Sequence, residues 1–328
     1  MYSLKRIFNI DEAKDLLLES GLDVPQNTDY TVGLYDAKKL IAVGSLSGNV
    51  IMGLATSPLY RGEGLIGTII SDLIDKASER NIYDLLLFTK PENAPQMENL
   101  GFCTIGSGNN CVILMERGPN GIEKYKKELM KEKFPAGQSG AIVMNLNPLT
   151  NGHLYLISKA LENCDALYIF VVEEDRSVFP FKARIEILQE TLNNHPKIKI
   201  LASGRYIISG ATFPSYFLKQ ADLAPAQAAL DIDIFARHIA PTLGIVKRFA
   251  GHEPFCSLTS IYNDFMRKIL PEAGIEFCEI ERLAKDGQYI SASAVRKLVE
   301  ENRFDEIKDM VPTPTFAYIM KTCAHFQG

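Results

Sequence analysis

The residues best suited to do chemistry stand at a predicted turn between an apolar segment and a helix, where the sequence reads NLNPLTNGHLYLISKA. The start of a helix presents free N–H groups and the positive end of the helix dipole, and both favour phosphate. Gly152 lets the backbone approach a ligand closely, Thr150 can cap the helix and contact phosphate, and His153 can donate to charge that builds on an α-phosphate. The candidate nucleotide-binding residues of this segment are Asn147, Pro148, Thr150, Gly152 and His153.

A second candidate anion site lies at residues 287–301, which read GQYISASAVRKLVEE. Ser291 and Ser293 stand at the start of a predicted helix, and Arg296 follows one turn later. Hydroxyls, exposed N–H groups and a guanidinium can converge there on one phosphate. Taken alone, each of the two segments is also compatible with a structural role, as a histidine at a helix start or as an ordinary serine N-cap.

A sheet must position these two segments, and residues 139–328 alternate short apolar strands with helical patterns. Such strands are typical of a buried parallel sheet. The alternation predicts a doubly wound, Rossmann-like α/β domain that binds ligands at the carboxyl ends of its strands. The predicted strands are 141–146, 166–172, 197–203, 245–251 and 275–280, and the predicted helices are 153–163, 181–193, 227–240, 259–270, 292–301, 303–310 and 313–324.

Residues 1–118 have the pattern of a separate α+β domain, with a helix after the sequence YRGEGLIG. Residues 119–138 are charged, flanked by Gly and Pro, and lack a thick apolar face, which predicts a helical linker. The sequence therefore predicts two domains joined by this linker. The predicted strands of the first domain lie at 31–36, within 39–57, where Gly and Asn turns interrupt them, and at 82–89, and a short helix is predicted at 93–102.

The composition of the 328-residue chain, 46% hydrophobic and 23% charged, is that of a globular protein with material for two cores. A net charge of −5 and a pI near 5.7 disfavour a nucleic-acid partner. The six cysteines show no CxxC spacing, as expected for thiols in a reducing compartment. The N-terminus has no signal-peptide pattern and no apolar run approaches the length of a membrane span. We therefore expect a soluble cytoplasmic protein with no membrane partner.

In their order and separation, the two phosphate-binding segments resemble the signatures of the HxGH nucleotidyltransferase superfamily, (H/T)xGH and ISSTxxR. The first reads TNGH at residues 150–153 and the second reads ISASAVR at 290–296. Ala292 replaces the usual second serine, so a hydroxyl contact from that position is absent. The resemblance implies that a nucleophile attacks the α-phosphorus of ATP and pyrophosphate leaves, with catalysis by positioning and charge stabilisation.

The intervening sequence is more specific, because residues 173–188, 206–219 and 231–263 are similar to the citrate lyase ligases. A GNAT-like domain in front of an HxGH domain is also the arrangement of that family. The resemblance implies an acid–thiol ligase that forms acetyl-adenylate from acetate and ATP. The acetyl group then passes to the thiol of a CoA-like prosthetic group on the acyl carrier subunit of citrate lyase. Mg²⁺ would accompany ATP through phosphate oxygens and water, since it rarely uses an all-protein cage.

Three basic residues in or beside these similar segments, Lys182, Arg184 and Lys219, are candidates for contact with phosphate or carboxylate. Arg184 can equally pair with a surface acid such as Glu186. The acidic run EED at 173–175 follows a predicted strand and either approaches the magnesium ion or forms a solvated loop.

In the first domain, a glycine-rich turn resembles the loop with which GNAT acetyltransferases bind the CoA pyrophosphate through backbone amides. Ile66 stands where that loop has a small residue. This domain is therefore either a site for a CoA-like arm or a structural domain. The candidate arm-binding residues are Arg61, Gly62, Gly64 and Gly67.

Three other functions remain compatible with the sequence: a pantetheine-phosphate or nucleotide adenylyltransferase, an N-acetyltransferase, and a non-catalytic assembly factor. ATP dependence separates the last two from the adenylate-forming enzymes, and acetate-dependent thioester formation separates the ligase from the adenylyltransferase. A zinc site is disfavoured. The HExxH-like start at His252 has Cys256 in place of the second histidine, and Pro254 would disrupt the helix. We expect no protein metal site.

Overall fold

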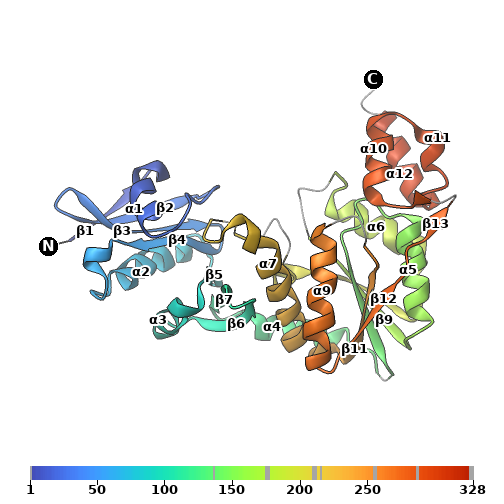
Figure 1. Ribbon diagram of the computed structural model, residues 1–328, viewed down its shortest axis with the longest axis horizontal. Coiled ribbons are helices and arrows are strands. Elements are labelled where there is room, and N and C mark those ends of the chain that lie inside the picture. Colours follow the sequence, from blue (N-terminus) through green and yellow to red (C-terminus); the bar gives the residue numbers. More distant parts are fainter. Residues whose placement is uncertain are drawn as a thin grey trace. The chain divides into compact units, whose positions relative to one another are not determined.

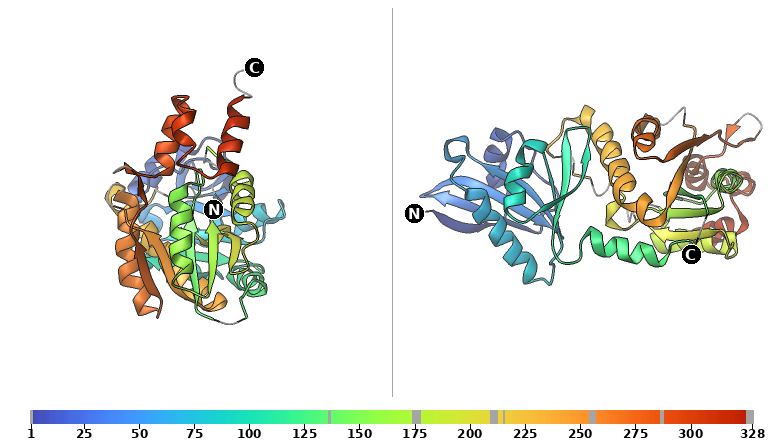
Figure 2. Two further views of the ribbon diagram at one scale, coloured as in Figure 1. Left: turned by 90° about the vertical axis from the view of Figure 1, so that its right-hand side faces the viewer. Right: turned by 90° about the horizontal axis from the view of Figure 1, so that it is seen from below.

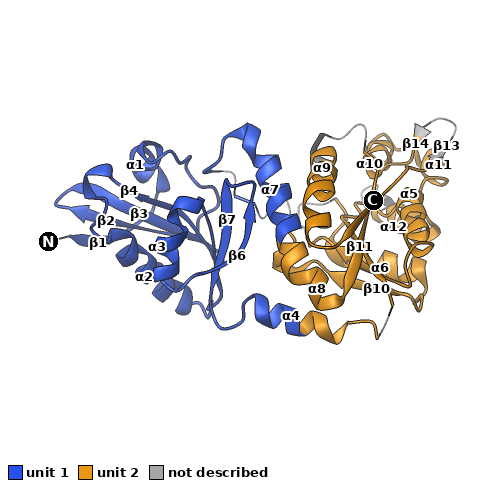
Figure 3. Cartoon of the chain, turned by 60° about the horizontal axis from the view of Figure 1, so that its bottom comes forward, with its two compact units in different colours: residues 1–127, 213–233 blue, residues 128–212, 234–328 orange. Residues whose placement is uncertain are grey.

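The computed structural model (Figures 1 and 2) describes residues 2–324 apart from 136, 174–177, 209–212, 215, 254–256, 286 and 287. The chain divides into two compact units. Unit 1 contains residues 1–127 and 213–233, and unit 2 contains residues 128–212 and 234–328 (Figure 3). None of the described helices is both long and apolar enough to cross a membrane.

Unit 1 is built on a seven-stranded sheet in the order β1-β2-β3-β4-β5-β7-β6. Neighbouring strands are antiparallel except β4 and β5, which are parallel. The predicted α+β, GNAT-like domain is confirmed, with β1, β6 and β7 as strands that the sequence did not reveal. The elements are β1 (Ser3–Ile7), α1 (Lys14–Glu19), β2 (Tyr30–Asp36), β3 (Lys39–Ser47), β4 (Val50–Thr56), α2 (Leu65–Ser78), β5 (Leu85–Thr89), α3 (Ala94–Asn99), β6 (Cys103–Gly108), β7 (Val112–Arg117) and α7 (Gln220–Ile234).

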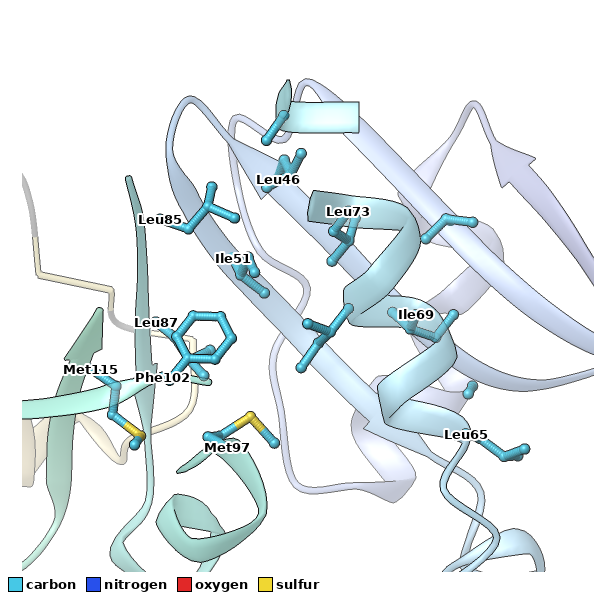
Figure 4. Packing of buried hydrophobic residues seen from close by; sticks show 14 of the residues in the cluster. Leu46, Ile51, Leu65, Ile69, Leu73, Leu85, Leu87, Met97, Phe102 and Met115 are labelled. Carbon is cyan, nitrogen blue, oxygen red and sulfur yellow. The ribbon is translucent and has the colours of Figure 1, made fainter. Parts of the chain in front are cut away.

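Helix α2 carries the principal apolar face of unit 1. Its residues Leu65, Ile69 and Leu73 recur at helical spacing and pack against the sheet, where Leu46 and Ile51 lie (Figure 4). All five side chains are buried, and each contributes about 1.5–3 kcal/mol relative to an exposed position. This packing holds α2, and with it the glycine-rich turn at its start, against the sheet.

The segment 213–233, which the sequence assigned to the second domain, groups with unit 1 (Figure 3). The backbone N–H of Ser107 in β6 donates to the carboxylate of Asp233 at 2.8 Å. Gly108 leaves no room for a Cβ, because the carbonyl oxygen of Ala226 in α7 lies against it. The chain therefore passes between the two units three times.

The predicted linker contains helix α4 (Ile122–Lys131), and the boundary between the units falls inside this helix. A helix is what its charged sequence and its Gly- and Pro-containing flanks indicated. The chain passes between the units again at 212/213 and at 233/234. The composition of the sequence at these two positions does not indicate a domain boundary.

Unit 2 is built on a five-stranded parallel sheet in the order β10-β9-β8-β11-β12. The chain begins at β8 in the middle, moves outwards to β10 and then crosses to β11, so the direction of winding reverses between β8 and β11. The predicted doubly wound fold is confirmed. The elements are β8 (Ser139–Met144), α5 (Asn151–Leu161), β9 (Ala166–Val171), α6 (Phe181–Leu192), β10 (Ile198–Ala202), α8 (Ala240–Leu243), β11 (Ile245–Gly251), α9 (Ser257–Glu272), β12 (Glu276–Ile280), β13 (Ala284–Lys285) and β14 (Gln288–Tyr289).

Three C-terminal helices gather at one end of unit 2 (Figures 1 and 2). The last of these helices and the connection before it hold the start of α5 through three hydrogen bonds. The side-chain amide of Asn151 donates to the carbonyl of Asp309 at 2.9 Å. The backbone N–H of Asn151 donates to the carbonyl of Met310 at 2.9 Å, and the hydroxyl of Thr315 donates to the carbonyl of Leu149 at 3.1 Å. The helices are α10 (Ala292–Glu300), α11 (Phe304–Ile307) and α12 (Thr313–Ala324).

Candidate active site

The main cleft of unit 2 opens where the strand order reverses. It encloses about 850 Å³ and is lined by the carboxyl ends of β8, β11 and β12 and by the starts of α5 and α10. Open α/β sheets bind nucleotides at such a crevice, and the volume is that of a cofactor site. Six residues singled out from the sequence line this one cleft: Thr150, Gly152, His153, Ser291, Ser293 and Arg296.

Thr150 and His153 form a reciprocal cap at the start of α5. The Thr150 hydroxyl accepts from the backbone N–H of His153 at 3.4 Å, and the backbone N–H of Thr150 donates to the imidazole Nδ1 at 3.0 Å. Because Nδ1 accepts this hydrogen bond, the proton of the neutral ring is on Nε2. The cap therefore selects the tautomer in which Nε2–H is the donor, on a side chain that lines the cleft.

The imidazole of His153 is neutral at physiological pH. Burial, and then the positive charge of Arg282, lower the pKa of His153 from 6.5 to about 4. A neutral ring with its proton on Nε2 can donate a hydrogen bond without first losing or gaining a proton.

We expect the His153 ring of the ligand-free protein to remain neutral as the pH falls through 6.5, where an ordinary histidine titrates. Between pH 6.5 and about 4 the unfolded chain binds more protons at this site than the folded chain. The contribution of His153 to the free energy of unfolding is thus present above pH 6.5 and is lost as the pH falls towards 4. NMR signals of the histidine rings, recorded as a function of pH, measure the titration of His153. The signal that is missing from the spectrum of His153→Gln belongs to this residue. A His153 signal that titrates near pH 6.5 in the folded protein contradicts the inference.

Gly152 is the point at which the two candidate segments meet. A Cβ on Gly152 would lie 2.9 Å from the backbone carbonyl oxygen of Ile290, closer than side chains approach backbone atoms. Glycine therefore lets the start of α5 lie against the segment that leads into α10. There Ser291 caps the helix by accepting from the backbone N–H of Ala294 at 3.1 Å, and its hydroxyl lies 3.2 Å from that of Ser293. Two helix N-termini thus border one cleft, an arrangement suited to phosphates.

Arg296 connects α10 to the turn before α5. Its Nη1 donates to the backbone carbonyl of Asn147 at 2.5 Å, and the side-chain oxygen of Asn147 accepts from the backbone N–H of Phe179 at 3.1 Å. Asn147 therefore belongs to the frame that holds the guanidinium, and neither Asn147 nor Pro148 is among the described residues that line the cleft. Arg296 also lines the cleft, so its other N–H donors can reach a bound anion.

We expect Arg296→Ala to weaken ATP binding by about 10–100-fold, because a hydrogen bond to a charged group contributes about 1.5–3 kcal/mol. Arg296→Lys is expected to recover part of the affinity, since lysine keeps the charge and loses the planar fork. Lys297→Ala is the matched control, because that neighbouring side chain is 75% exposed. Isothermal titration with ATP measures all three. An Arg296→Ala affinity equal to wild type would leave only a structural role.

Arg282 and Glu253 are cleft residues that the sequence did not reveal. Arg282 follows β12, donates from Nε to the carbonyl of His252 at 2.9 Å and pairs through Nη2 with the carboxylate of Glu253. Glu253 follows β11 and is buried. Both residues stand at the carboxyl ends of neighbouring parallel strands, so the rule that such ends meet at one edge would have placed them here.

The chain matches a known protein family over more than half its length. Residues 139–319 match the family described as the citrate lyase ligase C-terminal domain. Over 320 residues the chain is 38% identical to the citrate pro-3S-lyase ligase of Escherichia coli, a match that covers 96% of this chain and 91% of that protein.

The chain belongs to the citrate lyase ligase family.

This membership confirms the resemblance found in the sequence and makes the protein a ligase. A much shorter stretch, 71 residues, is 35% identical to the phosphopantetheine adenylyltransferase of Lactococcus lactis, and it covers 20% of this chain and 43% of that protein. The adenylyltransferase alternative therefore has support over a fifth of the chain only. Among solved structures, Thermotoga maritima TmcAL bound with alpha-thio ATP matches at 17% identity with a TM-score of 0.36, covering 57% of this chain and 56% of that chain.

The three basic candidates occupy different environments, and none is among the described residues that line the cleft. Arg184 is 1% exposed, and its guanidinium donates to backbone carbonyls that follow β8 and β9. It therefore braces the turn from inside instead of facing a phosphate. Lys182 is exposed and lies 3.8 Å from Glu186. Lys219 is exposed and belongs to unit 1.

The acidic run after β9 is only partly described. Glu173 accepts a hydrogen bond from the backbone N–H of Gly204 at 2.8 Å. Glu174 and Asp175 lie outside the described residues. Glu173 therefore serves to hold the turn after β10.

Proposed function

We propose that this ligase activates acetate with ATP and transfers the acetyl group to the thiol of a CoA-like prosthetic group on the acyl carrier subunit of citrate lyase. The observation that carries the proposal is the meeting, in one cleft, of two helix N-termini, the neutral His153 and Arg296. This arrangement suits a triphosphate. Relatives named for citrate lyase support the choice of acceptor.

In the first step a carboxylate oxygen of acetate attacks the α-phosphorus, the bond from that phosphorus to the β-bridging oxygen breaks, and pyrophosphate leaves. His153 donates Nε2–H to the α-phosphate oxygen on which charge grows. Arg296 holds the β- and γ-phosphates, which leave together. Thr150, Ser291 and Ser293, with the helix N–H groups beside them, complete the phosphate contacts. In the second step the thiol sulfur attacks the acetyl carbonyl, its proton is lost, and the carbon–oxygen bond to AMP breaks.

ATP is proposed to enter as its magnesium complex. Among the residues the structure describes, no three His, Cys, Asp or Glu side chains gather as a metal site does, and the cleft carboxylate Glu253 is paired with Arg282. These residues fit an ion held by phosphate oxygens and water. The ion neutralises triphosphate charge when bound.

The proposed substrates place the reaction in the cytoplasm, without nucleic acid or membrane as a partner. ATP is a cytoplasmic substrate and the acceptor is a free thiol, which a reducing compartment maintains. The thiols of Cys103, Cys111, Cys164 and Cys278 are likewise unpaired as disulfides.

The glycine-rich turn of unit 1 is proposed to bind the CoA-like arm of the acceptor. Gly62 and Gly64 have φ angles of 89° and 74°, which glycine adopts without strain. Gly64 is the N-cap of α2 and provides no side-chain cap, so the first N–H groups of the helix can receive a pyrophosphate. Arg61, Gly62 and Gly64 line a cleft in unit 1, whereas Gly67 lies inside α2.

We expect Gly64→Asp to lower acetyl transfer to the holo carrier relative to acetate-dependent ATP–pyrophosphate exchange by about tenfold or more. An added carboxylate repels the pyrophosphate, and lost charge-assisted hydrogen bonds cost about 1.5–3 kcal/mol. Both rates are measured in one preparation. An unchanged ratio in a folded protein means that the arm binds elsewhere.

The experiment that tests the proposed function incubates the protein with labelled acetate, ATP and the holo acyl carrier, and weighs the intact carrier by mass spectrometry. We expect one added acetyl group, with AMP and pyrophosphate released. Acetate-dependent ATP–pyrophosphate exchange tests the first step by itself. Exchange that requires phosphopantetheine in place of acetate would establish the adenylyltransferase. Acetylation from acetyl-CoA without ATP would establish the N-acetyltransferase, and no turnover in any arm would leave an assembly factor.

A further inference from the structure

Two arginines line the main cleft of unit 2, and only Arg296 has a part in the steps proposed above. Among the described residues around this cleft, Arg282 and Arg296 are the two that carry a permanent positive charge. They are held by different parts of the sheet. Arg296 is bound to the turn after β8 through the carbonyl of Asn147, whereas Arg282 is bound at the ends of β11 and β12. The cleft therefore has a second cationic position, separate from the one assigned to phosphate.

Two hydrogen bonds fix the guanidinium of Arg282 at this second position. Its Nε donates to the backbone carbonyl of His252 at 2.9 Å, and its Nη2 donates to the carboxylate of Glu253. The Glu253 side chain is only 6% exposed, whereas that of Arg282 is 26% exposed. A buried carboxylate that pairs with an arginine holds the guanidinium in one orientation, so Glu253 keeps Arg282 at the wall of the cleft.

The Nη1 group of Arg282 is available to a ligand. A guanidinium has five N–H donors in one plane, and the two bonds described above come from Nε and Nη2. Within the part of the chain that the structure describes, Nη1 donates to no residue. An arginine that is fixed through part of its fork can use its remaining donors to bind a planar anion such as a carboxylate.

The charges around Arg282 suit a carboxylate better than a phosphate. The carboxylate of Glu253 compensates the guanidinium, and Glu281, the preceding residue, also lines the cleft. These two acids repel a triphosphate, which carries several negative charges, more strongly than a monocarboxylate, which carries one. The helix N-termini and Arg296 offer the triphosphate a more favourable place. Arg282 therefore fits the smaller and less charged of the two anions that must meet in the reaction.

Arg282 also lies near the residue that is proposed to serve the α-phosphate. After burial, the positive charge of Arg282 is the second cause that lowers the pKa of His153. Both side chains line the same cleft. An anion on Arg282 is therefore held near the phosphorus that it must attack, and holding two reactants side by side is a large part of what an enzyme contributes to such a reaction.

We infer that Arg282 binds the carboxylate of the acid substrate, with Nη1 on one carboxylate oxygen, while Glu253 fixes the guanidinium. The inference rests on the proposed function, because the acid substrate there is acetate. The other carboxylate oxygen supplies the electron pair that forms the bond to the α-phosphorus, as the bond from that phosphorus to the leaving pyrophosphate breaks. The oxygen on Nη1 becomes the carbonyl oxygen of acetyl-adenylate.

The test measures acetate-dependent ATP–pyrophosphate exchange by the full chain at saturating ATP, as a function of acetate concentration. Arg282→Gln combined with Glu253→Gln removes both charges and leaves no buried carboxylate unpaired. This double variant is expected to raise the KM for acetate about 10–100-fold, the loss of a hydrogen bond to a charged group, with a smaller change in kcat. Arg282→Lys is expected to lie between wild type and the double variant, because lysine keeps the charge and loses the planar fork.

ATP affinity separates a carboxylate site from a phosphate site. Isothermal titration with ATP in the absence of acetate is expected to give the wild-type affinity in both variants. Arg267→Lys is the matched control. Arg267 also pairs with a glutamate, Glu279 in β12, but it is not among the described residues that line the cleft, so its variant is expected to keep the wild-type KM for acetate.

A wild-type KM for acetate in both Arg282 variants overturns the inference. A loss of ATP affinity as large as the rise in KM for acetate also overturns it, since Arg282 would then bind phosphate. When the wild type catalyses exchange, either result rejects this inference alone, whereas absent exchange in the wild type rejects the proposed function and the inference with it. If the double variant fails to fold, the KM for acetate of Arg282→Lys still decides.

Discussion

Replacing His153 with alanine is expected to slow acetate-dependent ATP–pyrophosphate exchange by about 10²–10³, the usual cost of one donor that serves developing charge. The backbone N–H of Thr150 occupies Nδ1 of His153, so the single donor that the ring offers is Nε2–H in the cleft. The low pKa of about 4 keeps that donor present at neutral pH. Exchange measured at saturating ATP isolates the effect on the chemical step from binding.

His153→Gln is the matched control for this prediction. Glutamine at the third helical position can accept from the N-cap N–H, as in a capping box, so it keeps the helix start while removing the imidazole. We expect His153→Gln to match wild type in thermal stability and to remain well below it in exchange. An alanine variant that exchanges at the wild-type rate would remove His153 from the mechanism. A glutamine variant that restores the full rate would show that only the cap matters.

The parts of the site that the sequence predicted are those governed by residues a few positions apart. Thr150 caps α5 and Ser291 caps α10 through partners three residues away, and such short-range bonds follow from residue type and spacing. The sequence did not show that Arg184 is buried, because its burial depends on how the segments after β8 and β9 come together. That arrangement is a tertiary property, which no local pattern in the sequence encodes.

Glu253 was noticed in the sequence, but only in connection with a different kind of site. In the sequence it belonged to a broken zinc motif, whereas in the structure its carboxylate pairs with Arg282 at the edge of the sheet. The strands β11 and β12 were both predicted, and their carboxyl ends are adjacent in the sheet. Applying the strand-end rule to every predicted strand, and not only to β8, would have brought Arg282 into the candidate site.

The fold of unit 2 was predictable because each buried parallel strand is a short apolar run, as in ALYIFV of β9. Strands β1 and β6 of unit 1 were harder to recognise, since SLKRI and CTIGSG mix polar residues and glycine with few apolar ones. The position of the segment 213–233 was beyond local signals. Its helix packs on β6 because Gly108 has no side chain there. The sequence around Gly108 does not indicate which distant segment packs against it.

The contact between Gly152 and Ile290 leads to the second large effect. Gly152→Val is expected to reduce acetate-dependent exchange by about 10²-fold, because the loss follows from a displacement of reacting groups by about 1 Å. A Cβ at this position already lies 2.9 Å from the carbonyl oxygen of Ile290, and the added methyl groups enlarge the required shift. The start of α5 must then move away from the segment that carries Ser291.

Gly152→Val is predicted to act by changing the position of the start of α5 in the cleft. Ser158→Val is the control for introducing valine into the same helix. Ser158 lies exposed on the same helix, so this change introduces the same β-branched side chain without a contact at the cleft, and we expect it to exchange at the wild-type rate. Gly152→Ala should fall between the two, since its single added carbon requires a smaller displacement. The substitution separates the two helix starts that bind phosphate. ATP affinity and turnover are therefore expected to fall in parallel along the series Gly, Ala, Val. Equal activity in Gly152→Val and Ser158→Val would mean that the two segments need not touch for catalysis, and that the cleft assembles its phosphate site in another way.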